Sequence, residues 1–151
     1  MIKPYVCVAC EKAIVAKDDV ASLIGLFSKI TIATVPGIEI LPNAVVPREW
    51  TIFSIWDIEP GDELKAYVLC TSITYPDRSQ FGELNKIKMN IEANKRSQMV
   101  VNVPVFPIGQ LGDYVVRTWV EEKDSMVVGP IEFKIRVEAQ ATPPVLSPGV
   151  C

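Results

Sequence analysis

The chain has 151 residues, of which 49% are apolar and 22% are charged, and it contains no histidine. This length suits one ordinary domain with a sizeable core, and the apolar content excludes intrinsic disorder. The formal net charge of −3 and the pI near 5.0 provide no basic excess for a phosphate backbone, so we expect no nucleic-acid partner.

The first residues of the chain and the length of its apolar runs indicate where in the cell we expect the protein. The uncharged run Tyr5 to Cys10 has six residues, which is too short for the apolar core of a signal peptide. No apolar run approaches the roughly 20 residues of a membrane span. We therefore expect a cytoplasmic protein with no membrane partner, in which the four cysteines are free thiols.

The first elements in chain order are predicted to be strands. Gly25 interrupts the apolar run within Lys17 to Ser28, and no window shows helical periodicity over about 11 residues, so we expect a strand with a bulge. Residues 34–48 contain three prolines and Gly37, which predicts an irregular crossover that has room for a short strand at Ile38 to Leu41.

The remaining strands fall into two kinds. Some are apolar on both faces, which is typical of strands that are covered on both sides or face a partner: Trp50 to Ile58, Leu64 to Tyr75, Met99 to Phe106 and Tyr114 to Glu121. Lys86 to Glu92 and Phe133 to Glu138 alternate strictly, which predicts one face in a core and the other in water.

Turn residues lie where these strands should end. Glu59 to Asp62 contains Pro60 and Gly61 in the order of a type II turn, which predicts a hairpin between the strands that begin at Trp50 and Leu64. Gly109 to Asp113 and Glu122 to Ser125 predict further turns and hence a C-terminal meander.

Together these elements predict an all-β fold, a two-sheet antiparallel β-sandwich of about eight or nine strands. The domain would span residues 1–138. Residues 139–151 lose the alternation and contain three prolines, so we expect a tail that is disordered or lies extended on a partner.

The candidate binding residues are aromatic or lie beside an aromatic side chain. Trp50, Trp56 and Trp119 could form a stacking platform, although most aromatic residues on strands rich in Val and Ile belong to a core. Trp119 shares a strand face with Arg117 and Glu121, and this mixed face favours exposure at an interface.

Catalysis, metal binding and cofactor binding are not expected. Without histidine, proton transfer would rest on Asp, Glu or Lys, and no catalytic triad can form. Cys7 and Cys10 are three residues apart, so in a strand they point to opposite faces and cannot hold one metal ion. The acidic turns, such as Asp57 to Glu63, could hold Ca²⁺ but are more often simply solvated.

Several short motifs resemble an uncharacterised family of small bacterial all-β proteins. They are Ala9 to Lys12, Ser22 to Ile30, Trp50 to Ser54, Val103 to Phe106, Gly112 to Tyr114 and Ile131 to Ile135. The resemblance covers about residues 3–138 and implies a β-sandwich, but it carries no activity and no functional residue.

Strands that are apolar on both faces and a mean hydropathy of +0.25 indicate apolar surface that a partner could cover. We therefore expect a non-enzymatic protein-interaction or structural module that associates with another protein or with copies of itself. The alternative is a β-sandwich that binds a small ligand or carbohydrate, with calcium as an aid.

Overall fold

The structure is a computed structural model that describes residues 1–34 and 37–141, and it confirms the all-β class. A single turn of 3-10 helix spans Asp62–Leu64. The described strands are β1 (Lys3–Val15), β2 (Ala21–Leu26), β3 (Lys29–Thr34), β4 (Val45–Val46), β5 (Trp50–Asp57), β6 (Tyr67–Thr74), β7 (Gln80–Lys88), β8 (Ser97–Val103), β9 (Phe106–Pro107), β10 (Gly112–Glu122) and β11 (Ser125–Ala141).

Two large sheets and one small ribbon contain these strands. Sheet A has the order β2-β1-β5-β8, sheet B has the order β3-β11-β10-β6-β7, and β4 pairs with β9. The strand pairs of the described chain are antiparallel except for β3 with β11, which is parallel. The expectation of purely antiparallel sheets is therefore wrong at β3, because the chain crosses from sheet A to sheet B after Leu26 instead of turning back on itself.

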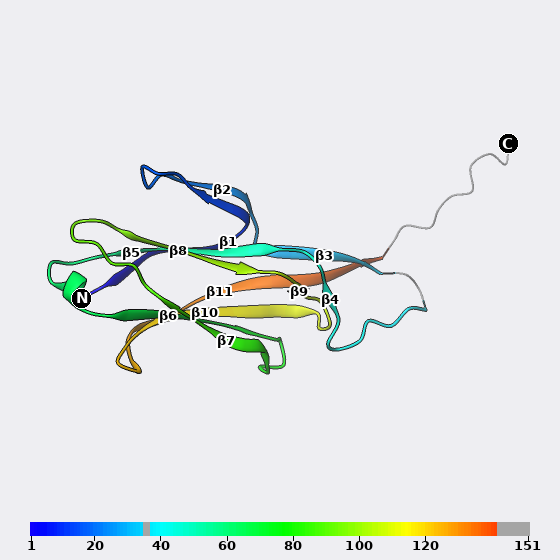
Figure 1. Cartoon of the computed structure of the whole chain (residues 1–151). Helices are drawn as coiled ribbons and strands as arrows, with labels where there is room; N and C mark the ends of the chain where they lie inside the picture. Colours follow the sequence, from blue (N-terminus) through cyan, green and yellow to red (C-terminus); the bar gives the residue numbers. More distant parts are fainter. Residues whose placement is uncertain (35–36, 142–151) are drawn as a thin grey trace.

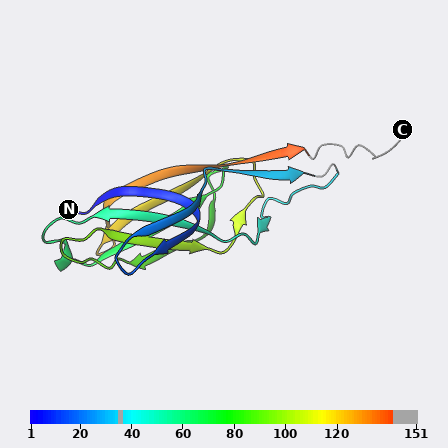
Figure 2. The ribbon, with the colours of Figure 1, turned by 90° about the horizontal axis from the view of Figure 1, so that it is seen from above.

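The two large sheets share one core, and sheet B is curled, so that in Figure 1 its strand β3 lies level with β5 and β8 while β6, β10 and β7 lie below them. Ile52 and Trp56 of β5 belong to the same buried cluster as Val116 of β10 and Ile135 of β11. Beyond this core, β3 and the C-terminal part of β11 extend together past the other strands (Figures 1 and 2). The end of the described chain therefore lies away from the first strand.

Strand β5 is buried on both faces, as its sequence predicts. Ile52 faces the shared core, and Phe53, on the opposite face, is also fully buried. The β1–β2 hairpin covers this second face, because the Nε2 of Gln98 in β8 donates a hydrogen bond of 2.6 Å to the backbone oxygen of Asp19 at the hairpin tip. The hairpin therefore crosses over β5 to reach β8, and in Figure 1 it lies above these two strands.

The predicted turn at Glu59 to Asp62 is confirmed, but the hairpin is not. The backbone N–H of Asp62 donates to the oxygen of Glu59 at 3.1 Å, and Gly61 has the positive φ of 96° that the third position of a type II turn needs. However, β5 and β6 lie in different sheets. The turn leads into the 3-10 helix and carries the chain across, so β6 begins at Tyr67 and not at Leu64.

Several other boundaries differ from the expectation. The strand predicted at Met99 to Phe106 ends at Val103 as β8, and Phe106 begins the separate strand β9. The strand predicted at Lys86 to Glu92 ends at Lys88 as β7, although burial alternates as predicted through Glu92. Ile38 to Leu41 carries no strand in the described chain, and the crossover instead holds β4. Strand β11 continues to Ala141, so residues 139–141 pair with β3 and are not part of a tail.

Of the predicted meander, the last hairpin is present and the rest is not. Lys123 and Asp124 both have positive φ in the two-residue loop that joins β10 to β11, and this geometry matches the twist of the two strands. Strand β8, by contrast, lies in sheet A. The part of the predicted tail at residues 142–151 lies outside the described residues.

Candidate functional site

Two of the four candidate binding residues lie in the core. Trp50 and Trp56 are fully buried. The indole N–H of Trp50 donates to the backbone oxygen of Val105 at 3.0 Å, and that of Trp56 donates to the hydroxyl of Ser54 at 2.9 Å. Their polar atoms are satisfied within the chain, and they offer no surface for a ligand to stack on.

The other two candidates share the outer face of sheet B with Glu121, as the sequence indicates. Trp119 is half-buried, and its indole N–H donates to Oε1 of Glu121 at 3.0 Å. This bond and the ammonium of Lys86 hold the pKa of Glu121 below its usual range. Arg117 is exposed and pairs with Glu132 at 2.6 Å. This face is therefore largely satisfied by bonds within the chain.

Carboxylates on the acidic turn after β5 also have partners inside the chain. Asp57 pairs with Arg96 at 2.7 Å, and Glu59 pairs with Lys3 at 2.7 Å. In the described part of the chain no three His, Cys, Asp or Glu side chains are grouped so that they could hold a metal ion. The idea of a calcium-assisted site therefore gains no support from this turn.

Along one side of the molecule, the short outer strands β2 and β3 each cover only part of the long strand beside them, β1 and β11 respectively. Among the described residues, β2 pairs with β1 over Cys10–Val15, and residues 3–9 of β1 pair with β5 alone, apart from one hydrogen bond that the carbonyl of Ala9 accepts from Phe27. In the same way, β3 pairs with β11 over Arg136–Ala141 and leaves residues 125–135 paired with β10 alone. We call these two uncovered stretches, with the space between them, the open side.

The open side follows from how the chain passes between the sheets. After β2 it crosses at Phe27 and Ser28 and enters sheet B as β3. The backbone N–H of Phe27 donates to Ala9 at 3.2 Å, and Ser28 accepts from the N–H of Arg136 at 2.9 Å. This crossing closes the side at one end and leaves the rest of β1 and β11 uncovered.

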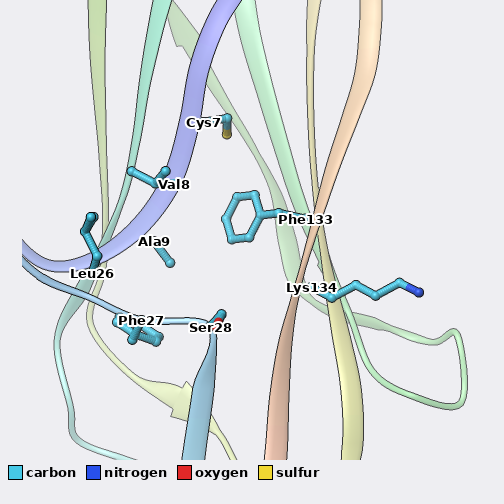
Figure 3. A pocket seen from close by; sticks show the side chains of 8 residues that line it. All are labelled: Cys7, Val8, Ala9, Leu26, Phe27, Ser28, Phe133 and Lys134. Atoms are coloured by element: carbon cyan, nitrogen blue, oxygen red, sulfur yellow. The ribbon is translucent and has the colours of Figure 1, made fainter.

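A cleft of about 280 Å³ lies on the open side next to the crossing. Its walls are mainly apolar, and Figure 3 shows the side chains of Cys7 and Phe133 pointing into it from opposite strands, with Phe27 at one end and Lys134 pointing away. Strands that are paired on one side expose alternate backbone N–H and C=O groups on the other. The site therefore combines free hydrogen-bonding edges with an apolar cleft.

The three described cysteines, of which Cys7 alone lines this cleft, have raised thiol pKa values. Burial raises the pKa of the Cys7 thiol, and the thiol donates a weak hydrogen bond of 3.9 Å to the hydroxyl of Thr118. Burial likewise raises the pKa of Cys10 and brings that of Cys70 to about 11. Because the thiolate is the reactive form, these raised values disfavour covalent chemistry at neutral pH.

No protein-family model matches the chain, and no curated protein is significantly similar to it. Membership of the bacterial family that the motifs resemble therefore stays a prediction. In the part of the chain that the structure describes, no helix is both long enough and apolar enough to cross a membrane.

Sequence reasoning did not find the open side. The available signal was the uncharged run Tyr5 to Cys10. A strand with one buried face needs an apolar residue only at every second position, and this run has no charged residue at any position. The half-coverage itself depends on where β2 and β3 end relative to their longer neighbours, and the sequence pattern does not show which strands are neighbours.

Proposed function

We propose that the chain is a non-enzymatic protein-interaction module, a two-sheet sandwich that binds an extended segment of another protein along its open side. The observation that carries this proposal is the pair of half-covered edges, β1 over residues 3–9 and β11 over residues 125–135, with an apolar cleft between them. An added strand could bond to either edge through its main chain.

The cleft supports a peptide more than a separate small molecule. Its volume of about 280 Å³ lies just below the roughly 300–1,000 Å³ of ligand pockets, and it suits one or two side chains of a bound segment. Specificity would come from the apolar residue that enters between Cys7 and Phe133.

The other hypotheses have less support. A carbohydrate platform is disfavoured because Trp50 and Trp56 are buried and Trp119 is bonded to Glu121. An enzyme is disfavoured because the chain has no histidine and its described thiols are held in the protonated form.

The proposal can be tested by selecting binders from a library of unstructured peptides and mapping where they bind. Hydrogen exchange of the full chain with a selected peptide should slow at backbone amides of residues 3–9 or 125–135. Phe133→Ala should weaken binding by at least about tenfold, because it removes one wall of the cleft.

The matched control is Ile87→Ala, which removes a half-buried apolar side chain from β7, away from the cleft. It should destabilise the fold to a similar degree and leave peptide affinity unchanged. Protection on β7 or β8 instead of the open side, or equal loss of affinity in both variants, would reject the proposal.

A further inference from the structure

Strand β2 is an edge strand with an unusual surface. It belongs to the end of sheet A and, among the described residues, pairs with β1 alone. Its sequence, Ala-Ser-Leu-Ile-Gly-Leu, has no charge and no proline. Ile24 is 49% exposed and Leu26 is 62% exposed, and Ile14 of β1, on the same hairpin, is 45% exposed. Proteins usually protect such edges, because free backbone groups beside apolar side chains invite pairing with another strand.

The other outer strands of the large sheets, β7, β3 and β8, carry charge or lack large exposed apolar side chains. Strand β7 has Glu83, Lys86 and Lys88. It differs from β2 in this charge and not in its backbone, because Gly82 of β7 and Gly25 of β2 both have a φ of 66°. Strand β3 begins at Lys29. Strand β8 is also uncharged, but its one exposed side chain is that of Asn102. Among these described edges, β2 alone combines the lack of charge with large exposed apolar side chains.

We infer that β2 pairs with β2 of a second copy of this chain in antiparallel fashion, centred near Leu23 and Ile24, to give a two-fold dimer. An exposed apolar surface is covered well by another apolar surface, and in a two-fold interface the same surface meets itself. Ile24 then lies beside Ile24 of the second copy, so that these two exposed apolar side chains cover each other.

The charges that flank β2 favour the antiparallel direction. Asp18 and Asp19 precede the strand and Lys29 follows it. Asp19 pairs with Lys95 and Lys29 pairs with Glu138, yet the side chains of Asp19 and Lys29 are 64% and 56% exposed. Antiparallel pairing brings the acidic end of one copy toward the basic end of the other, whereas parallel pairing would place like charges together.

A contact of this size gives a weak dimer. A six-residue strand pair with a few apolar side chains lies at the low end of specific interfaces, so we expect a dissociation constant in the micromolar range. This β2 surface is separate from the peptide-binding edges proposed above. The two sites adjoin at Leu26, which lies in β2 and also lines the cleft. Neither conclusion depends on the other.

The test is sedimentation equilibrium of the full chain over a concentration series up to about 0.5 mM. Wild type should dimerise reversibly, and Ile24→Lys should weaken the dimer by at least about tenfold, because it places like charges together at the two-fold axis. Leu64→Lys is the control: Leu64 is 85% exposed on the 3-10 helix, away from β2, and its variant should dimerise as wild type does.

A mixture of Ile24→Lys and Ile24→Glu chains provides the decisive result. Each alone should be monomeric, and the mixture should recover a heterodimer, because opposite charges then meet across the axis. A monomeric wild type, an Ile24→Lys variant that still dimerises, or a mixture that stays monomeric would overturn the inference. None of these outcomes would alter peptide protection on residues 3–9 or 125–135, so failure here is distinguishable from failure of the proposed function.

Discussion

Strands β1 and β5 are neighbours in sheet A, yet they differ in how completely the fold covers them. Strand β5 pairs with β1 on one side and β8 on the other, and the shared core and the β1–β2 hairpin bury its two faces. Strand β1 begins with seven residues, 3–9, that pair on one side alone among the described strands. The two adjacent strands have similar apolar content, yet β5 stabilises the core and the first part of β1 forms a candidate binding edge.

The comparison shows that apolar residues on both faces of a strand do not by themselves indicate a partner. In β5 they indicate a central position that the chain itself covers. The candidate sites instead lie where a short strand fails to cover a long one, as at the open side, or where an edge lacks charge, as at β2. Substitutions that separate stability from binding can sharpen this distinction.

The largest effect is expected in β5. Trp56→Ala removes the whole indole of a fully buried residue and should lower the free energy of unfolding by about 3–5 kcal/mol, as measured by urea denaturation. Phe133→Ala on the open side removes a half-buried ring and should cost about 1–2 kcal/mol. If the two losses of stability were equal, Phe133 would be as much a part of the core as Trp56. The contrast between the covered strand β5 and the open side would then fail.

A smaller effect is expected where the chain crosses from β5 to β6. Tyr67 is buried, and its hydroxyl donates a hydrogen bond of 3.0 Å to Oδ1 of Asp62, which is also buried. Tyr67→Phe would leave that oxygen without this donor and should cost about 1–3 kcal/mol. The matched control is Tyr75→Phe, because no hydrogen bond to the Tyr75 hydroxyl is present among the described residues, and its cost should stay near zero.

The same tyrosine predicts a loss of stability in alkali. Burial, followed by the neighbouring Asp62, raises the pKa of Tyr67 to about 12 from an ordinary value of 10. The folded state therefore holds this proton more tightly than the unfolded state. Its contribution to stability is complete below about pH 10 and is lost as the pH rises toward 12. Tyr67→Phe should show less loss of stability over this range, and an unchanged alkaline profile would contradict the assignment.

Much of the fold could be predicted because its signals are local. Burial follows the alternation in Phe133 to Glu138, and the turn at Glu59 to Asp62 has the expected Gly61 geometry. The partners of each strand could not be predicted, because pairing is set by contacts between residues far apart in the chain. The sequence does not show that β5 and β6 lie in different sheets, or that β3 runs parallel to β11.

The candidate site was predicted poorly for a related reason. Tryptophans on strands can belong to a core or to a platform, and the choice for Trp50 and Trp56 depends on which sheet lies opposite. Trp119 and Arg117 were placed correctly on one face, because alternation within a single strand decides that point. An edge is a property of a finished sheet, so neither the open side nor the exposed edge of β2 could be read from one segment.

The smallest predicted effect is a local loss of protection in residues 3–9 of β1 when the ion pair that anchors this segment is broken. Lys3, at the start of this strand, forms an ion pair of 2.7 Å with Glu59 on the turn after β5. Hydrogen bonding to Lys3, together with the amino group of Met1, lowers the pKa of Glu59 to about 2 from an ordinary 4.5. A carboxylate with a lowered pKa stabilises the folded state above about pH 4.5, and this contribution is lost as the pH falls toward 2.

The loss should be local, because the rest of β1 is held by β5 and β2. Between pH 4.5 and 2, hydrogen exchange at residues 3–9 should accelerate more than exchange in β5, once the intrinsic pH dependence is subtracted. Glu59→Gln should show the faster exchange already at neutral pH and little further change in acid. Glu63→Gln, on the same turn but without an ion pair among the described residues, should behave as wild type does. If β1 and β5 were to lose protection together in acid, the uncovered half of β1 would be as firmly held as the core strand, and it would be a poor place for a partner strand to add.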